Sequence, residues 1–581
     1  MRAALSTTSP VPQRAPRRAR FLPWAPLLTL AVMLGPVLAG LLGTLAPAFG
    51  YMPALGGTGV SLAAFDALFA WPGLSRAVML SLGVGVAATG CSLAIVVLIC
   101  AGWAGTRIFG MIERLLSPLL SVPHAAAAFG LAFLIAPSGW ITRALSPWAT
   151  GWERPPDLLI LQDPAGLSLI FGLVTKEVPF LLLMTLAALG QVRPGQSLRV
   201  AQALGYGRVT GWLKVIFPLV YRQIRLPVYA VLAFSMSVVD VAIILGPNTP
   251  PTLAVQVVRW MSDPDLAFRF QAAAGAVLQL GLVLVGLGLW RLMELAVARI
   301  GRLWIASGAR GRRRGEQTMR VGALVLGALA ALAVIAGLAG QVAWSFAGLW
   351  QFPDFWPDAF TLRNWQRHGP RLVGPATETL VIAGAATALA LLLTLASLEA
   401  EHRHGLRPAT RALWLLYLPL IVPQVAFLMG FQTLSILTGV DGGRAAVVLA
   451  HLVFVLPYVF LSLSDPWRAW DRRQDTIARA LGAGPDRVLW AVRLPMLLRP
   501  LLIAAAVGFA VSVGQYLPTL LVGAGRVATL TTEAVALASG GDRRVTGVFA
   551  LAQTAAAFAP FALAVLLPRV LWRNRKGMRD G

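Results

Sequence analysis

Long apolar runs alternate with short polar segments along almost the whole chain. A helix that crosses the hydrocarbon core of a bilayer needs roughly 20 apolar residues. Two of the runs, 321–350 and 380–398, contain no charged residue at all. The pattern predicts an all-α polytopic membrane protein with about 12 transmembrane helices. The expected spans are 22–46, 76–100, 115–136, 167–190, 222–246, 272–296, 321–345, 376–398, 412–436, 445–464, 500–523 and 547–571.

Basic residues gather in every second loop between the apolar runs. Arg107 and Arg114 occupy one of these loops, and Arg468 and Arg472 occupy another, whereas the intervening loops have far fewer. Because Arg and Lys in short loops favour the cytoplasmic side, we expect both chain termini in the cytoplasm. The apolar stretch 21–48 is too long for the core of a cleaved signal peptide, so we expect it to remain as a membrane anchor.

Composition indicates that lipid solvates much of the protein surface. Of the 581 residues, 57% are hydrophobic and 13% are charged, whereas soluble domains carry about 25% charged residues. The net charge of +25 would suit a nucleic-acid-binding protein. Because the basic residues follow the membrane topology instead, we expect membrane lipid and no nucleic acid among the partners. No Cys/His cluster has metal-site spacing, so no metal is expected.

An ordered set of short motifs occurs twice in the chain. The pattern Ala-x-Ala-Leu-Gly stands at 201–205 and again at 478–482, and each Gly is followed 13 residues later by a Pro. Several matched pairs in one order indicate a duplication. Each half has six expected spans, an even number, so the halves are predicted to be parallel repeats with the same topology. The other matched pairs are Pro123 with Pro423, Pro179 with Pro457, Asp240 with Gln515, and Thr252 with Thr529.

The duplication suggests an organisation of two six-helix repeats joined by a basic linker. We expect a cytoplasmic N-terminus at 1–20, a first repeat at 21–298, a linker at 299–320, a second repeat at 321–571, and a cytoplasmic tail at 572–581. The linker contains the sequence Gly-Arg-Arg-Arg-Gly, which is typical of a loop. A solvated topology anchor is its simpler interpretation, and contact with anionic lipid headgroups is the alternative.

The segment between the fourth and fifth spans of each repeat is amphipathic. In the first copy Leu198, Ala201 and Leu204 are apolar and Arg199 lies between them. Gly205 is suited to end a helix at positive φ. A rigid surface helix joined to two membrane helices is able to transmit force. An ordinary interfacial helix is the simpler interpretation, but two copies at matched positions favour the first.

This motif resembles the EAA loop of ABC-importer permeases. Two copies in one chain are similar to the fused permeases of the ferric-iron and thiamine type, over roughly 70–296 and 370–571. In that family the loop forms a short coupling helix that docks on the cytoplasmic ATPase. The Glu that opens the family's loop is replaced here by Arg199 and Thr476. The resemblance assigns Ala201, Ala203, Leu204, Gly205 and Pro218 to coupling loop 1, and Ala478, Ala480, Leu481, Gly482 and Pro495 to coupling loop 2.

The resemblance implies the type I ABC-importer permease fold and a role as the permease subunit of a bacterial importer. It implies a multi-pass protein of the cytoplasmic (inner) membrane, two ABC ATPase subunits as partners, and an extracytoplasmic protein that delivers a small solute. The chain has no G-x-x-x-x-G-K-[ST] phosphate loop. We therefore expect no enzyme activity and no cofactor in this chain, with ATP bound and hydrolysed by the partner.

A few polar residues fall inside the expected spans, where they are functional candidates by default. Asp240 and Gln515 occupy matched positions beside Ser237 and Ser512. These four residues are hypothesised to line the translocation path between the repeats. The simpler interpretation is hydrogen bonding between helices, at about 0.6 kcal/mol per contact.

Other intramembrane residues are expected to have local structural roles. Lys176 and Glu177 are adjacent in sequence and point about 100° apart on a helix, so we expect their partners on neighbouring helices. Four prolines are expected to break helices within the membrane. They are Pro123, Pro179, Pro423 and Pro457.

Two alternatives to the importer hypothesis stay open. An ion- or proton-coupled secondary transporter also fits two repeats of six helices, and it would depend on carboxylates such as Asp240 and Glu378. An intramembrane enzyme acting on lipid would need a catalytic cluster, which the sequence does not show. The paired loops favour the importer, because a secondary carrier has no use for them. The solute is open between ferric iron, thiamine, an oxyanion and a polyamine.

Overall fold

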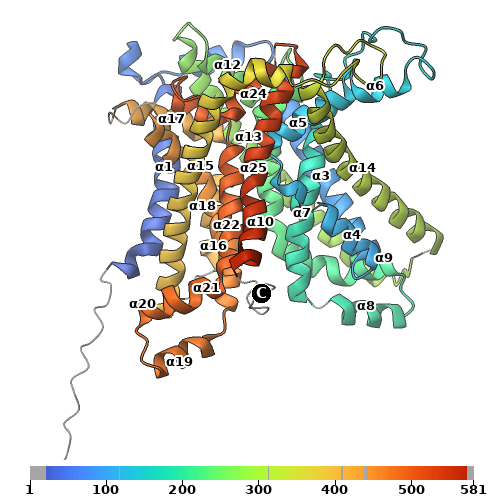
Figure 1. Cartoon of the computed structure of the whole chain (residues 1–581), viewed down its shortest axis with the longest axis vertical. Coiled ribbons are helices and arrows are strands. Elements are labelled where there is room, and N and C mark those ends of the chain that lie inside the picture. Colours follow the sequence, from blue (N-terminus) through green and yellow to red (C-terminus); the bar gives the residue numbers. More distant parts are fainter. Residues whose placement is uncertain are drawn as a thin grey trace, which may run out of the picture.

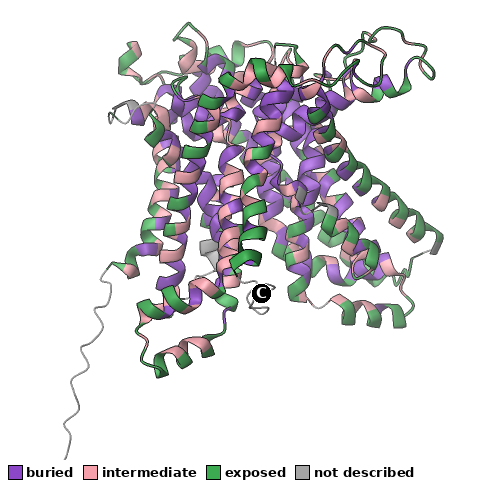
Figure 2. Cartoon of the chain, in the orientation of Figure 1, coloured by how far each residue is buried: buried purple, intermediate pink, exposed green. Residues whose placement is uncertain are grey.

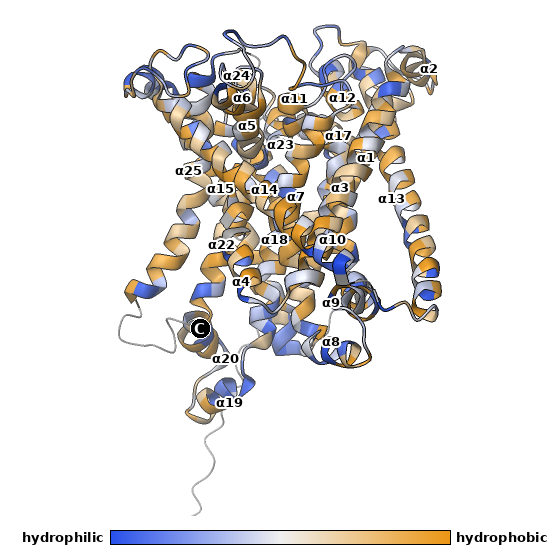
Figure 3. Ribbon diagram, turned by 90° about the vertical axis from the view of Figure 1, so that its right-hand side faces the viewer, coloured by the Kyte–Doolittle hydropathy of each residue, from blue (hydrophilic) through white to orange (hydrophobic). Residues whose placement is uncertain are grey.

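The computed structural model describes residues 21–571 apart from 117, 193, 312, 407–409, 438, 440–442 and 539. The expected N-terminal segment 1–20 and the tail 572–581 lie outside the described residues. Ten helices among the described residues are long and apolar enough to cross a membrane, or up to 12 if each strongly bent pair is one span. This confirms the predicted all-α polytopic fold, and Figure 3 shows the apolar helices between two more polar ends.

The long helices follow the expected spans in order. The first repeat contains α1 (Ala25–Ala48), α3 (Leu74–Trp103), α5 (His124–Ile135), α7 (Leu167–Val192), α10 (Phe217–Ser237) and α13 (Phe268–Ala306). The second contains α14 (Arg313–Phe346), α15 (Arg363–His404), α16 (Thr410–Ile421) with α17 (Gln424–Leu437), α18 (Arg444–Ala469), α22 (Leu498–Val513) and α25 (Arg543–Leu571).

Shorter helices lie at the ends of these spans. Those of the first repeat are α2 (Ala63–Ala70), α4 (Arg107–Leu116), α6 (Trp140–Leu145), α8 (Pro194–Ala203), α9 (Arg208–Gly211), α11 (Asp240–Leu245) and α12 (Leu253–Met261). Those of the second are α19 (Arg472–Ala480), α20 (Pro485–Val488), α21 (Leu494–Met496), α23 (Leu517–Gly523) and α24 (Leu530–Ala538).

The two repeats share one packing pattern. Helices α3, α7 and α10 pack against one another, and α15, α18 and α22 do the same in the second repeat. The first helix of each repeat crosses to the other: α1 packs on α17 and α15, while α14 packs on α5 and α3. The halves are therefore interlocked, and Figure 2 shows their buried residues gathered around the central helices.

Glycines make these two crossings possible. A Cβ atom on Gly40 of α1 would collide with the carbonyl group of Phe427 in α17, and one on Gly430 would collide with Gly40. At the matching crossing, a Cβ on Gly130 of α5 would lie 2.7 Å from the carbonyl carbon of Gly337 in α14. Small residues allow helix backbones to approach closely in a membrane, where packing drives association.

Several of the expected spans are broken part-way along their length. The breaks at Pro123 and Pro423 confirm two of the four expected proline interruptions, and α16 and α17 meet at a bend of 88°. The expectation was wrong for Pro179 and Pro457, because α7 and α18 continue through them. A membrane helix tolerates proline where neighbouring groups satisfy the backbone carbonyl it frees. Two further breaks, at 238–239 and 514–516, were not expected from the sequence.

The connection between the repeats is more helical than the expected linker 299–320. Helix α13 continues to Ala306 and α14 begins at Arg313, so only 307–312 separates them. Leucine, alanine and arginine, which are frequent on both sides of this gap, are strong helix formers. The basic residues of this segment therefore lie mainly on helix ends that extend beyond the apolar spans.

The close crossing of α1 and α17 at Gly40 predicts that substitutions at two glycines of α1 change stability by different amounts. Gly40→Ala should destabilise the folded protein by about 1–3 kcal/mol or more, because its methyl group has no room against α17. Gly35→Ala in the same helix should change stability by less than about 1 kcal/mol, since nothing lies within 4 Å of its Cβ position. Thermal unfolding of the purified chains in detergent measures both, and equal stabilities would contradict this packing.

Candidate coupling loops and the central helix breaks

Coupling loop 1 begins with helix α8, which ends at Ala203, and the chain then turns at Gly205 toward the fifth span. The amide of Gly205 donates to the carbonyl of Gln202 at 2.9 Å, and the amide of Tyr206 donates to that of Ala201 at 3.1 Å. This pair of bonds is a Schellman motif, which needs a left-handed residue after the helix. Gly205 supplies it with φ +84°. A π-helical turn at Trp212–Ile216 then leads into α10.

Coupling loop 2 has the same backbone structure. Gly482 has φ +86° and donates to the carbonyl of Arg479 at 2.9 Å, while Ala483 donates to that of Ala478 at 3.0 Å. A short helix and a π-helical turn at Leu489–Arg493 again follow. Pro218 and Pro495 stand near the start of the next helix, α10 and α21, where a proline costs no helical hydrogen bond. Both loops lie at the same end of the molecule (Figure 1).

Each loop presents a matched apolar pair to solvent. Val200 and Leu204 are 61% and 60% exposed, and the residues 277 positions later, Ile477 and Leu481, are 55% and 84% exposed. Ala203 and Ala480 are also exposed, whereas Ala201 is buried against Gly211. Apolar surface beyond the membrane-spanning region is typical of a site that contacts another protein.

A buried cation holds each π-helical turn in place. Lys214 of loop 1 is 7% exposed; its Nζ donates to the carbonyls of Trp304 and Ala309 at 2.8 and 2.7 Å. It also lies 4.7 Å from the centre of the Trp304 ring. All of these partners belong to the connection between the repeats, so loop 1 is fixed to the linker.

Loop 2 uses an ion pair instead. Arg493, only 2% exposed, donates to Glu399 at 2.5 Å and lies 4.5 Å from the ring centre of Trp470. The same carboxylate accepts from Arg403 at 2.6 Å, and Arg403 also contacts Asp486 at 2.8 Å. Glu399 and Arg403 lie near the end of α15, so this loop is fixed within its own repeat.

Lys214, Arg493 and Glu399 were not among the site residues predicted from the sequence. One signal was available. Both cations stand within four residues before the proline that ends each motif, Pro218 or Pro495. Their partners lie about 90 residues away in sequence, and no local pattern identifies them.

The polar residues expected along the path lie at the central breaks. Asp240 is buried and begins α11 directly after the break at 238–239, and Gln515 lies within the break at 514–516. Ser237 donates to the carbonyl of Ala233 at 2.7 Å. Ser512 is 2.8 Å from Nδ1 of His451, so both serines form hydrogen bonds within the helix packing.

The breaks of the two repeats approach one another. A Cβ atom on Gly514 of the second repeat would lie 3.9 Å from Pro123 of the first. Beside Pro123, Lys176 donates to the carbonyls of Leu119 and Val122 at 2.9 and 2.6 Å. The carbonyl of Leu119 also accepts from the amide of Val122 at 3.3 Å, so the ammonium group is a further donor to the backbone at this break.

Glu177 has a different neighbour. Its carboxylate lies 3.7 Å from Nε2 of His124, the first residue of α5, whose side chain is 40% exposed. Lys176 and Glu177 therefore find their partners on other elements, as the sequence predicted.

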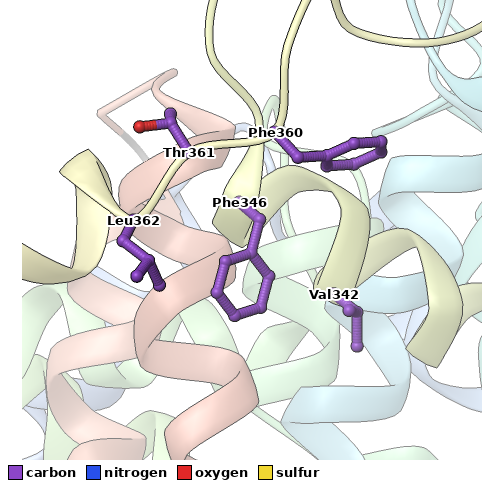
Figure 4. Close-up of a pocket in the computed structure, with 5 residues that line it drawn as sticks. All are labelled: Val342, Phe346, Phe360, Thr361 and Leu362. Carbon is purple, nitrogen blue, oxygen red and sulfur yellow. The ribbon is translucent and has the colours of Figure 1, made fainter.

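The hollow drawn in Figure 4 is not part of this centre. It is lined by Val342 and Phe346 of α14 and by the following loop, with Thr361 as its one polar side chain. None of these lining residues belongs to the helix breaks described above. Its apolar lining and exposed Phe360 fit a lipid-facing surface better than a solute path.

Comparison with known proteins places the chain among transport proteins. The family described as binding-protein-dependent transport system inner membrane component matches residues 393–571. The inner membrane ABC transporter permease protein YnjC of Escherichia coli (strain K12) is 34% identical over 566 residues, which cover 96% of this chain and 98% of that protein.

Relatives with a named solute match shorter segments. The molybdenum transport system permease protein ModB of Mycobacterium tuberculosis is 32% identical over 27% of this chain and 66% of its own length. The putrescine transport system permease protein PotI of Escherichia coli (strain K12) is 30% identical over 23% of this chain and 49% of its own length. No solved structure matches the chain.

The buried ion pair of Glu399 with Arg493 predicts that substitutions at two nearby glutamates reduce stability by unequal amounts. Glu399→Ala should cost about 3–5 kcal/mol of stability, because it leaves Arg493 buried without its carboxylate. Glu401→Ala removes a partner of Arg468, a cation that is 36% exposed, and should cost about 0–1 kcal/mol. Unfolding in detergent compares the two variants, and the assignment of Glu399 as the main anchor fails if they lose the same stability.

Proposed function

The chain belongs to the family of binding-protein-dependent inner-membrane permease components of ABC importers, and on that premise we propose that it forms the complete translocation path of such an importer. It is a multi-pass inner-membrane protein related over almost its full length to an ABC transporter permease. We propose that this path carries a small solute delivered by an extracytoplasmic binding protein. Its opening and closing would be coupled to separate ATPase subunits.

The main observation that supports the proposal is the pair of matching loops. Each is a helix that directly follows one membrane span and is joined to the next span by a short helix and a π-helical turn. Each exposes two apolar residues at equivalent positions on the same end of the molecule. Two equivalent docking helices fit two ATPase subunits, whose closure would move the attached helices α7, α10, α18 and α22.

The location of these loops also supports an orientation. The described start of α1 and the described end of α25 lie at the end of the molecule that carries both loops (Figure 1). If the loops dock cytoplasmic ATPases, both chain termini are cytoplasmic. ATP would be bound and hydrolysed by those partners, since the chain lacks a phosphate-binding loop, and we propose no catalytic role or cofactor for it.

We further propose that the solute passes the central breaks. Ser237, Asp240, Ser512 and Gln515 are candidates for contact with it, as broken helices place free backbone groups and polar side chains at the membrane midplane. Relatives are named for molybdenum and for polyamines. Transport assays in proteoliposomes with ferric iron, thiamine, an oxyanion and a polyamine would identify the class.

Replacing the exposed apolar residues tests the docking loops. The double variant Leu204→Glu plus Leu481→Glu should lose the ATPase subunits during purification from native membranes, because a carboxylate in an apolar contact is desolvated without a partner. The control is Val60→Glu plus Leu62→Glu. These residues are 85% and 60% exposed outside the coupling loops, and this variant should retain the ATPase.

Intact-mass analysis and ATP hydrolysis of the purified samples measure the outcome. Two ATPase subunits with the wild type and the control, and none with the loop variant, agree with the proposal. A chain that purifies alone and moves solute along an ion gradient would instead be a secondary transporter, and Asp240 and Glu378 would be the residues to examine.

A further inference from the structure

Coupling loop 1 receives a carboxylate from the other repeat. Glu316, in the first turn of α14, accepts hydrogen bonds from the amide of Thr210 at 2.9 Å and from its hydroxyl at 2.6 Å. Its second oxygen accepts from the amide of Val209 at 3.3 Å. These amides belong to the first turn of α9, where helix N–H groups lack internal partners and favour a negative charge.

The main chain of the linker also forms hydrogen bonds with coupling loop 1. The amide of Gly207 donates to the carbonyl of Arg310 at 2.9 Å, and Lys214 binds the carbonyls of Trp304 and Ala309. A Cβ atom on Gly207 would collide with the Glu316 carboxylate. Loop 1 thus contacts Trp304, Ala309 and Arg310 of the linker as well as Glu316 of α14.

The second loop carries its own acid at the equivalent place. Asp486, 277 residues after Val209, lies in the first turn of α20, whereas the first turn of α9 has no acidic residue. Glu316 is also the one acidic residue in the sequence between 295 and 353. Loop 1 lacks an acid at this position, and the first-turn amides of α9 are bonded by a carboxylate more than 100 positions away, in α14.

We propose that Glu316 is a positioning residue that fixes coupling loop 1 to the first helix of the second repeat. Because α14 packs on α3 and α5 of the first repeat, movement of loop 1 is transmitted through Glu316 to a helix that both repeats share. Loop 2, anchored by Glu399 within its own repeat, has no such role. The inference rests on the proposed coupling function, and it makes the two ATPase contacts unequal.

Glu316→Gln in the full chain with its ATPase subunits tests the contact directly. A glutamine keeps one acceptor oxygen but sets an NH2 group against an amide donor, so the first turn of α9 should open more often. Hydrogen–deuterium exchange of Val209 and Thr210 should become about tenfold faster, while 484–488 in loop 2 stays unchanged. Glu401→Gln, which alters a carboxylate near loop 2, should leave 207–211 unchanged.

The coupling role needs a second readout. The amount of solute imported per ATP hydrolysed should fall at least about threefold in Glu316→Gln, although the ATPase still co-purifies. Thr210→Val removes only the hydroxyl bond and should produce a smaller effect in the same direction. It provides the test if Glu316→Gln does not fold.

The outcomes separate this inference from the proposed function. Unchanged exchange at Val209 and Thr210 overturns the positioning role, whatever the chain transports. Faster exchange with an unchanged ratio of solute to ATP overturns the link to coupling. If the Leu204 and Leu481 variant keeps its ATPase, the docking proposal fails by itself, and the exchange result on Glu316 remains a separate measurement.

Discussion

Lipid tails are as apolar as leucine, so membrane helices gain little by hiding apolar side chains from one another and associate through close packing. The structure meets this constraint at two crossings, where Gly40 and Gly430 bring α1 against α17, and Gly130 and Gly337 bring α14 against α5. Each crossing joins the first helix of one repeat to the body of the other. The two repeats consequently form one interlocked unit.

The exchange also places the start of α14 beside the first coupling loop. From there Glu316 reaches the first turn of α9, and the linker carbonyls reach Lys214. The duplicated loops have kept one backbone, with a left-handed glycine and a proline 13 residues later. Their anchors are different, since one loop binds the linker and the other binds Glu399 at the end of α15. A linker that joins the repeats makes the first arrangement possible.

The central breaks show a second consequence of the membrane environment. A broken helix leaves backbone carbonyls without partners, and no water is available in the bilayer core to satisfy them. Lys176 donates to the carbonyls of Leu119 and Val122 just before Pro123. Polar residues such as Asp240 and Gln515 stand at the other breaks. At one such place the breaks of the two repeats approach each other, where a Cβ on Gly514 would lie 3.9 Å from Pro123.

The sequence alone determined the features that depend on neighbouring residues. Apolar run length predicted the order of the spans, and the repeated glycine and proline predicted where both loops turn, because a left-handed turn and a missing amide are local properties of single residues. Local rules failed at Pro179, where the surrounding packing keeps α7 continuous.

Only the tertiary structure decided which distant groups meet. Glu316 and Thr210 are 106 residues apart, and Arg493 and Glu399 are 94 apart. Such pairs form because helix packing brings distant segments together, and a buried charge such as Arg493 is costly unless it is paired. No pattern along the chain records that proximity.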